Sequence, residues 1–184
     1  MEVPDSELIA QCLRGHNNAF NILVERYQKQ IYLYCARILG NPDDASDAVQ
    51  DCFIKAYYAL NSFRSDSPFM PWLFRIARNA CIDITRMRSR RNTSSIDEIE
   101  EARGSLPSNE PNPEECALKN EADEFVMDAI QRLPERYRTA ITLFHVNRLS
   151  IREISIAMGR PEGTVKSDLH HAREMLRCSL EGEV

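Results

Sequence analysis

Residues 150–172 read SIREISIAMGRPEGTVKSDLHHA, and this stretch decides the fold. Ser150 followed by Glu153 is typical of a capping box, in which each side chain bonds to the other residue's backbone N–H. A short helix therefore begins here and stops at Gly159, and Pro161 begins a longer one. A short helix, a tight turn and a longer helix predict a helix-turn-helix, whose second helix enters the major groove of DNA. A plain helical hairpin within a bundle is the alternative interpretation.

The second helix of this motif presents small polar and basic side chains away from its apolar face. Such side chains suit contacts with base edges and phosphates. The candidate DNA-binding residues of the motif are Arg152, Thr164, Lys166, Ser167, His170 and His171. Asp168 lies among them and would repel phosphate, unless it accepts a hydrogen bond from cytosine N4 or pairs with a neighbouring base-reading cation.

The rest of the chain also has helical periodicity. Apolar residues recur every three or four positions, and no stretch alternates as a strand would. The expected helix boundaries are a cap at Asp5 or Ser6, a stop at Gly40, and starts at Pro42 and Pro71. The predicted fold class is therefore all-α.

The middle of the chain lacks this periodicity and is acidic. Residues 93–123 hold nine acidic and two basic residues, whereas the whole chain has a formal net charge of -5. This composition predicts a flexible linker at 93–122 that lets two small helical domains, 1–92 and 123–184, move independently. The C-terminal domain contains the helix-turn-helix.

The helix that follows Pro71 is basic on its outer face. Residues 75–91 contain six arginines and one aspartate, and a loop with three aromatic residues precedes them. Aromatic rings beside guanidinium groups suit single-stranded DNA, because the rings stack on bases and the cations meet phosphates. A charge run alone is as consistent with a solvated face, and Trp72 is as consistent with packing.

The helix after Pro42 has a second face that its own core does not explain. It mixes carboxylates with apolar side chains at helical spacing, in the residues Asp47, Gln50, Asp51, Ile54 and Tyr58. Such a mixture suits docking onto a partner helix. An exposed helix with two incidental apolar residues is the alternative.

Several classes of function find no support in the sequence. The six cysteines form no CxxC pair, the four histidines show no metal-ligand spacing, and no Gly-rich phosphate loop or GxSxG motif occurs. No stretch of about 18 apolar residues occurs either. We therefore expect no catalytic residue, metal or cofactor, no membrane insertion, and a cytoplasmic location.

Five segments together resemble the signatures of the extracytoplasmic-function (ECF) sigma factors of the sigma-70 family, in the family's order and spacing. They are AFNILVERY at 19–27, DASDAVQDCFIKAY at 44–57, FRSDSPF at 63–69, WLFRIARN at 72–79, and the stretch from LPERYR at 133–138 to GTVKS at 163–167. The resemblance runs from about Asp5 to Arg177 and is broken only at the linker.

This resemblance implies an alternative sigma factor, not an enzyme, that directs core RNA polymerase to promoters and is held inactive by an anti-sigma factor. The helix with Asp47 and Ile54 would dock on the β′ clamp, and the polymerase β flap is a second expected contact. Recognition and melting of the minus-10 element is expected of Phe63, Arg64, Ser65, Asp66, Phe69, Trp72, Arg75, Arg78, Asn79 and Arg86. The helix-turn-helix would read the minus-35 element.

The recognition helix departs from the family pattern, which usually has arginine where this chain has Asp168 and often where it has His171. The departure puts the usual minus-35 sequence in doubt. Two rival hypotheses remain: an adaptor that mimics a sigma factor and binds only the anti-sigma factor, and an ordinary helix-turn-helix repressor. The repressor would not need the aromatic loop and usually forms dimers.

Overall fold

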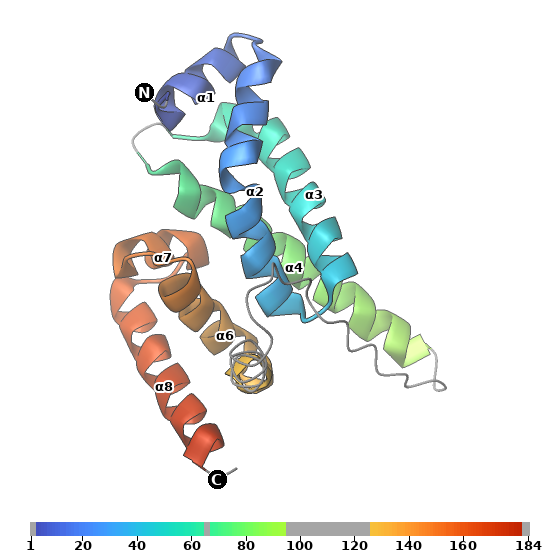
Figure 1. Cartoon of the computed structure of the whole chain (residues 1–184), viewed down its shortest axis with the longest axis vertical. Helices are drawn as coiled ribbons and strands as arrows, with labels where there is room; N and C mark the ends of the chain where they lie inside the picture. The colour runs from blue at the N-terminus through green and yellow to red at the C-terminus, as the bar shows by residue number, and fades with distance from the viewer. Residues whose placement is uncertain (1–2, 65–66, 95–125, 182–184) are drawn as a thin grey trace, which may run out of the picture.

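The computed structural model describes residues 3–64, 67–94 and 126–181, and every regular element within these ranges is helical (Figure 1). In chain order they are α1 (Asp5–Leu13), α2 (Asn17–Leu39), α3 (Pro42–Ala59), the short η1 (Leu60–Ser62), α4 (Phe69–Ser94), a helical stretch at 126–132, α6 (Glu135–Ile141), the π-helical turn η2 (Thr142–Val146), α7 (Ile151–Met158) and α8 (Glu162–Glu181). The all-α prediction is confirmed. Residues 95–122 of the predicted linker lie outside the described residues, and 93–94 belong to α4.

The N-terminal domain consists of α1 to α4 around one core. Leu23 and Ile31 of α2 and Leu73 of α4 are fully buried. The ring of Phe74 in α4 meets that of Tyr34 in α2 edge to face, with centroids 5.4 Å apart. These contacts hold one side of α4 against α2, so the opposite side of α4 faces outward.

Local signals at the α2–α3 junction set these two helices. Gly40 adopts a left-handed φ of 67°, which ends α2 after Leu39. The side chain of Asn41 then accepts a hydrogen bond from the backbone N–H of Asp44 at 3.0 Å, and Pro42 occupies the first position of α3. The stop at Gly40 and the start at Pro42 agree with the prediction.

The first and fourth helices begin differently from the prediction. Neither Asp5 nor Ser6 caps α1, because Pro4 stands at the cap position and the Asp5 carboxylate instead pairs with Arg26. Helix α4 begins at Phe69, so that Pro71 is its third residue. Proline is tolerated there because the first N–H groups of a helix have no partner within it.

The C-terminal domain contains the predicted helix-turn-helix. Ser150 and Glu153 form the capping box at the start of α7: the N–H of Glu153 donates to Ser150 Oγ at 3.3 Å, and the N–H of Ser150 donates to Glu153 Oε2 at 2.8 Å. Gly159, with φ 64°, ends α7, and α8 follows after the turn. Ile154 of α7 and Val165 of α8 are fully buried between the helices.

The two domains are in contact, with α7 against α4 and η2 against α2 (Figure 1). The guanidinium of Arg138 in α6 donates to the carbonyl of Ile38 near the end of α2, at 2.8 Å, and Gln131 donates to the carbonyl of Arg37. Asn147 donates to the carbonyl of Gln30 at 3.2 Å. Backbone carbonyls of α2 therefore accept most of the polar contacts between the domains.

Candidate nucleic-acid and polymerase interfaces

The expected docking face of α3 lies outside the core. Ala45, Ala48, Cys52 and Ala56 form the buried side of this helix. The opposite side carries all five predicted residues, exposed in four cases and half-buried in one: Asp47, Gln50, Asp51, Ile54 and Tyr58.

This face is apolar at one end and charged at the other. Ile54 is 49% exposed and Tyr58 is 78% exposed. The Asp51 carboxylate lies 2.7 Å from Lys55 Nζ, and Lys55 also reaches Asp83 of α4 at 3.3 Å. The hydrogen bond that Lys55 donates to Asp51, and then the one to Asp83, outweigh its partial burial and raise the pKa of Lys55, so it is a cation at neutral pH.

Tyr57 belongs to the same surface and was not among the predicted residues. It is 41% exposed, its ring centroid lies 5.8 Å from that of Tyr58, and its hydroxyl donates to Asn17 Oδ1 at 3.0 Å. Tyr57 lies three residues after Ile54, so the helical period could have placed it on this face.

The outer face of α4 divides into exposed and paired residues. Arg75, Asn79 and Arg86 are exposed. Arg78 is half-buried, and its guanidinium lies 3.7 Å from Glu135 of α6. In this arrangement the C-terminal domain therefore neutralises one cation of the predicted minus-10 surface.

The three aromatic residues beside α4 form one cluster. The ring centroid of Phe63 lies 5.1 Å from that of Trp72 and 5.6 Å from that of Phe69. Phe69 is only 4% exposed and packs on Tyr27, whereas Phe63 and Trp72 are half-buried. Phe69 therefore supports the cluster from the core, and only Phe63 and Trp72 have ring surface left for a base.

A hollow of about 390 Å³ opens beside this cluster. Its lining includes Asp5, Ile9, Tyr27, Phe63 and Met70. Burial, and next the hydrogen bond that its hydroxyl donates to Asp5, raise the pKa of Tyr27 well above its usual value. The hollow is therefore mainly apolar, with a carboxylate and a protonated phenol at its edge.

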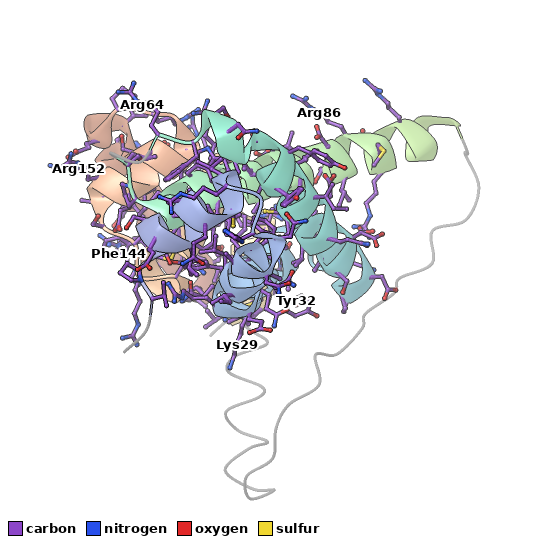
Figure 2. All side chains as sticks on the ribbon, turned by 90° about the horizontal axis from the view of Figure 1, so that it is seen from above. Lys29, Tyr32, Arg64, Arg86, Phe144 and Arg152 are labelled. Carbon is purple, nitrogen blue, oxygen red and sulfur yellow. The ribbon has the colours of Figure 1, made fainter. Side chains whose placement is uncertain are left out.

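The loop before α4 lies close to the helix-turn-helix. A second hollow, of about 400 Å³, is lined by Ser67 and Pro68 on one side and by Ser150, Arg152 and Ile156 on the other. Figure 2 shows Arg64 and Arg152 projecting outward on the same side of the molecule, with Arg86 well apart along α4. The predicted residues Ser65 and Asp66 lie outside the described residues.

The outer face of α8 presents four of its predicted residues, namely Lys166, Ser167, His170 and His171, all exposed. Thr164 is half-buried, and Arg152 of α7 is exposed. The rings of His170 and His171 lie 5.7 Å apart, and His171 lies 6.0 Å from Tyr137. Hydroxyl, imidazole and ammonium groups are thus available on one side of the recognition helix.

Asp168 is different from its neighbours on α8. Its side chain is 6% exposed, and Oδ2 accepts a hydrogen bond from Arg160 Nη1 at 3.0 Å. The sequence left two roles open for Asp168, and the structure shows that it pairs with a neighbouring cation, Arg160. Arg160 was not among the predicted residues, because only the folded turn brings positions 160 and 168 together.

Three of the described cysteines lie in the core of the N-terminal domain. Cys35, Cys52 and Cys81 are buried in the N-terminal domain. The hydrogen bond with Cys81, and next burial, raise the pKa of Cys35, and burial raises that of Cys52. These two groups remain thiols at neutral pH.

Residues 3–64, 67–94 and 126–181 offer neither a metal site nor a membrane span. There, no cluster of three or more Cys, His, Asp or Glu residues is suited to hold a metal ion. None of the helices in these ranges has both the length and the apolar character of a bilayer span.

Comparisons with known proteins agree with the two-domain arrangement. Residues 23–92 match the family model for Sigma-70 region 2, and residues 126–176 match that for Sigma-70, region 4. The chain is 41% identical over 180 residues to the ECF RNA polymerase sigma-E factor of Escherichia coli strain K12, covering 95% of this chain and 93% of that relative. It is 35% identical over 186 residues to the ECF RNA polymerase sigma factor SigW of Bacillus subtilis strain 168, covering 98% of each.

Solved structures show the same fold. CnrH, in complex with the cytosolic domain of CnrY, superposes with a TM-score of 0.72 at 27% identity, over 98% of this chain and 99% of that one. The sigma factor RpoE from Bartonella quintana, in complex with the anti-sigma factor NepR, gives a TM-score of 0.73 at 25% identity, over 88% and 96%. These matches identify the chain as a sigma-70-type transcription initiation factor. Within that class, the chain belongs to the ECF sigma factors.

Proposed function

We propose that this chain binds core RNA polymerase in the cytoplasm and directs it to specific promoters, without catalysing a reaction itself. The observation that supports this most directly is the identity of 41% with a sigma-E factor over nearly the full length of both chains. The outward faces of α3, α4 and α8 supply one surface for each step: polymerase docking, melting of the minus-10 element and reading of the minus-35 element.

The docking step is assigned to α3. Ile54 and Tyr58 offer apolar area for a helix of the β′ clamp, and Asp47, Gln50 and Asp51 offer a polar rim. The C-terminal domain is assigned the contact with the β flap.

The melting step is assigned to the loop and the first half of α4. A base that leaves the duplex would stack on Phe63 or Trp72, while Arg75 and Asn79 hold the strand. Stacking contributes about 1–3 kcal/mol per base, so a few captured bases offset the local loss of pairing. Phe69 is assigned to the support of these rings because it is buried.

An anti-sigma factor is the proposed regulator. The RpoE of Bartonella quintana was solved in complex with the anti-sigma factor NepR, and CnrH with the cytosolic domain of CnrY; both matches cover most of this chain. The half-exposed aromatic loop and the face of α3 are the surfaces that such a partner would need to mask.

Run-off transcription with core polymerase on a genomic promoter library tests the proposal. The variants are Arg75→Ala/Asn79→Ala, for melting, and Ile54→Asp, for docking. Lys29→Ala, an exposed change on α2, is the control. We expect start sites with wild type and Lys29→Ala, loss of starts with both other variants, and loss of core binding with Ile54→Asp alone.

The rival adaptor hypothesis gives a different result. An adaptor would bind an anti-sigma factor tightly and produce no start sites with any variant, wild type included. That outcome would overturn the initiation proposal.

A further inference from the structure

Arg160, in the turn between α7 and α8, forms an ion pair with Asp168 of α8. Neither residue is part of the surfaces assigned to polymerase or DNA so far. Among the Asp, Glu, Lys and Arg residues of 3–64, 67–90 and 126–180, only Asp168 is buried, with 4% of its surface exposed. Its partner, Arg160, has 36% of its side chain exposed. A buried carboxylate thus holds a guanidinium that still reaches the surface.

The backbone of Arg160 is held as firmly as its side chain. Its N–H donates to the carbonyl of Ser155 at 3.1 Å, and its own carbonyl accepts from the Ser155 hydroxyl at 2.6 Å. Pro161 follows directly and restricts the backbone further. Arg160 therefore has a fixed position two residues before the first residue of α8, Glu162.

Only Arg160 of this pair can contact DNA directly. Asp168 is too buried to contact DNA, so it acts only through Arg160. A guanidinium has five N–H donors in a planar fork, and a carboxylate on one edge orients the plane and leaves other donors for a second partner. Among base edges, the guanine O6 and N7 atoms match this fork in a bidentate manner.

We propose that Arg160 reads a guanine in the minus-35 element and that Asp168 is the residue that positions it. The inference rests on the proposed sigma function and adds a specificity residue that lies outside the recognition helix. A guanidinium held by a carboxylate discriminates one base pair, whereas a mobile cation attracts phosphate at every sequence.

The test measures transcription by holoenzyme, made from core polymerase and the full chain, on promoters with a randomised minus-35 element. Wild type should favour one G·C pair by roughly 5- to 150-fold, the range that a bidentate arginine contact gives. Arg160→Lys keeps the charge but removes the fork, and should lose this preference while the other positions keep theirs. Asp168→Asn keeps an acceptor without the charge and should weaken the preference at the same base pair.

A purely structural pair gives a different pattern. Arg160→Lys and Asp168→Asn would then retain the wild-type preference at every position, or lose activity uniformly with a lower unfolding temperature by circular dichroism. Either result would overturn this inference while the sigma function stands. Absence of any start site with wild-type holoenzyme would overturn both proposals.

The charge-swapped variant Arg160→Asp/Asp168→Arg adds a second check, with circular dichroism used to verify that the chain is folded. It retains one acid and one base across the turn but moves the cation into α8. If Arg160 reads the base, the folded swapped chain should have a changed base preference. An unchanged preference would count against the proposal.

Discussion

At the scale of single residues, Phe74 carries much of the stability of the N-terminal domain. It is fully buried, and its ring packs edge to face on Tyr34. We expect Phe74→Ala to lower the free energy of unfolding by about 3–5 kcal/mol, because the transfer term and the cavity term add. Urea denaturation measures this, with Lys29→Ala as an exposed control that should change it by less than about 0.5 kcal/mol. A loss below about 1 kcal/mol for Phe74→Ala would contradict the packing.

His145 gives the C-terminal domain a pH dependence. His145 is exposed, but partial desolvation of its ring, and next the charge of Arg173, lower the pKa of His145 from its usual value of 6.5. The unfolded chain therefore binds the proton more readily, and stability is lost as the pH falls through about 6.5. We expect the urea midpoint of wild type to fall more between pH 7.5 and 5.5 than that of His145→Gln. Equal falls in the two proteins would exclude this role of His145.

Residue roles could be predicted only where the sequence period determines the exposed face. The helical period placed Ile54 and Tyr58 outside, and both are exposed. It did not distinguish Phe69, which is buried, from Phe63 beside it. The sequence did not predict that Arg160 is the partner of Asp168 either, because an ion pair across a turn depends on how the two helices pack.

At the scale of elements, the capping box of α7 determines where the helix-turn-helix begins. Ser150→Ala should lower the free energy of unfolding of the C-terminal domain by about 0.5–2 kcal/mol, because an N–H at the start of α7 loses its acceptor. Thermal unfolding followed by circular dichroism measures the change. Ser150→Asp is the matched control: aspartate is an equally good cap and should retain most of the stability.

Most element boundaries could be read from glycine and proline, as at Gly40, Pro42 and Gly159. The π-helical turn η2 could not be predicted from glycine or proline. Apolar spacing through Phe144 fits an α-helix equally well, and the turn differs only in the hydrogen bonds of its backbone. The start of α4 was missed because proline is compatible with each position of a first turn.

At the scale of the whole molecule, the contact between the domains had no signal in the sequence. Arg138 and Gln131 donate to carbonyls near the end of α2, and any helix end offers such carbonyls. Burial lowers the pKa of Arg138, in keeping with its position between the domains. Composition predicted two domains, but not the face by which they meet.

We expect the domains to separate when the factor binds a promoter. The minus-10 and minus-35 elements are about 25 base pairs apart by their names, or roughly 85 Å at 3.4 Å per base pair. Two small domains in contact do not span this distance. We expect energy transfer between dyes on the exposed Cys178 and on an introduced Lys29→Cys to fall when the factor binds core polymerase. Unchanged transfer would contradict this expectation.

The polar contacts between the domains can be weakened directly. Arg138→Ala/Gln131→Ala removes the donors to the carbonyls of Ile38 and Arg37. We expect this variant to show lower energy transfer before any polymerase is added. Lys55→Ala, whose ion pairs lie within the N-terminal domain, is the control and should behave as wild type.

The closed contact of α7 with α4 also bears on how sigma factors share a limited pool of polymerase. If only an open form binds, the apparent dissociation constant equals the intrinsic one divided by the open fraction. An open fraction of one in a hundred would raise the amount of factor needed for half-occupancy about 100-fold. Residues that hold the two domains together but are not among the assigned docking or DNA-reading residues, such as Asn147, would then tune the cellular dose at which this factor displaces its competitors.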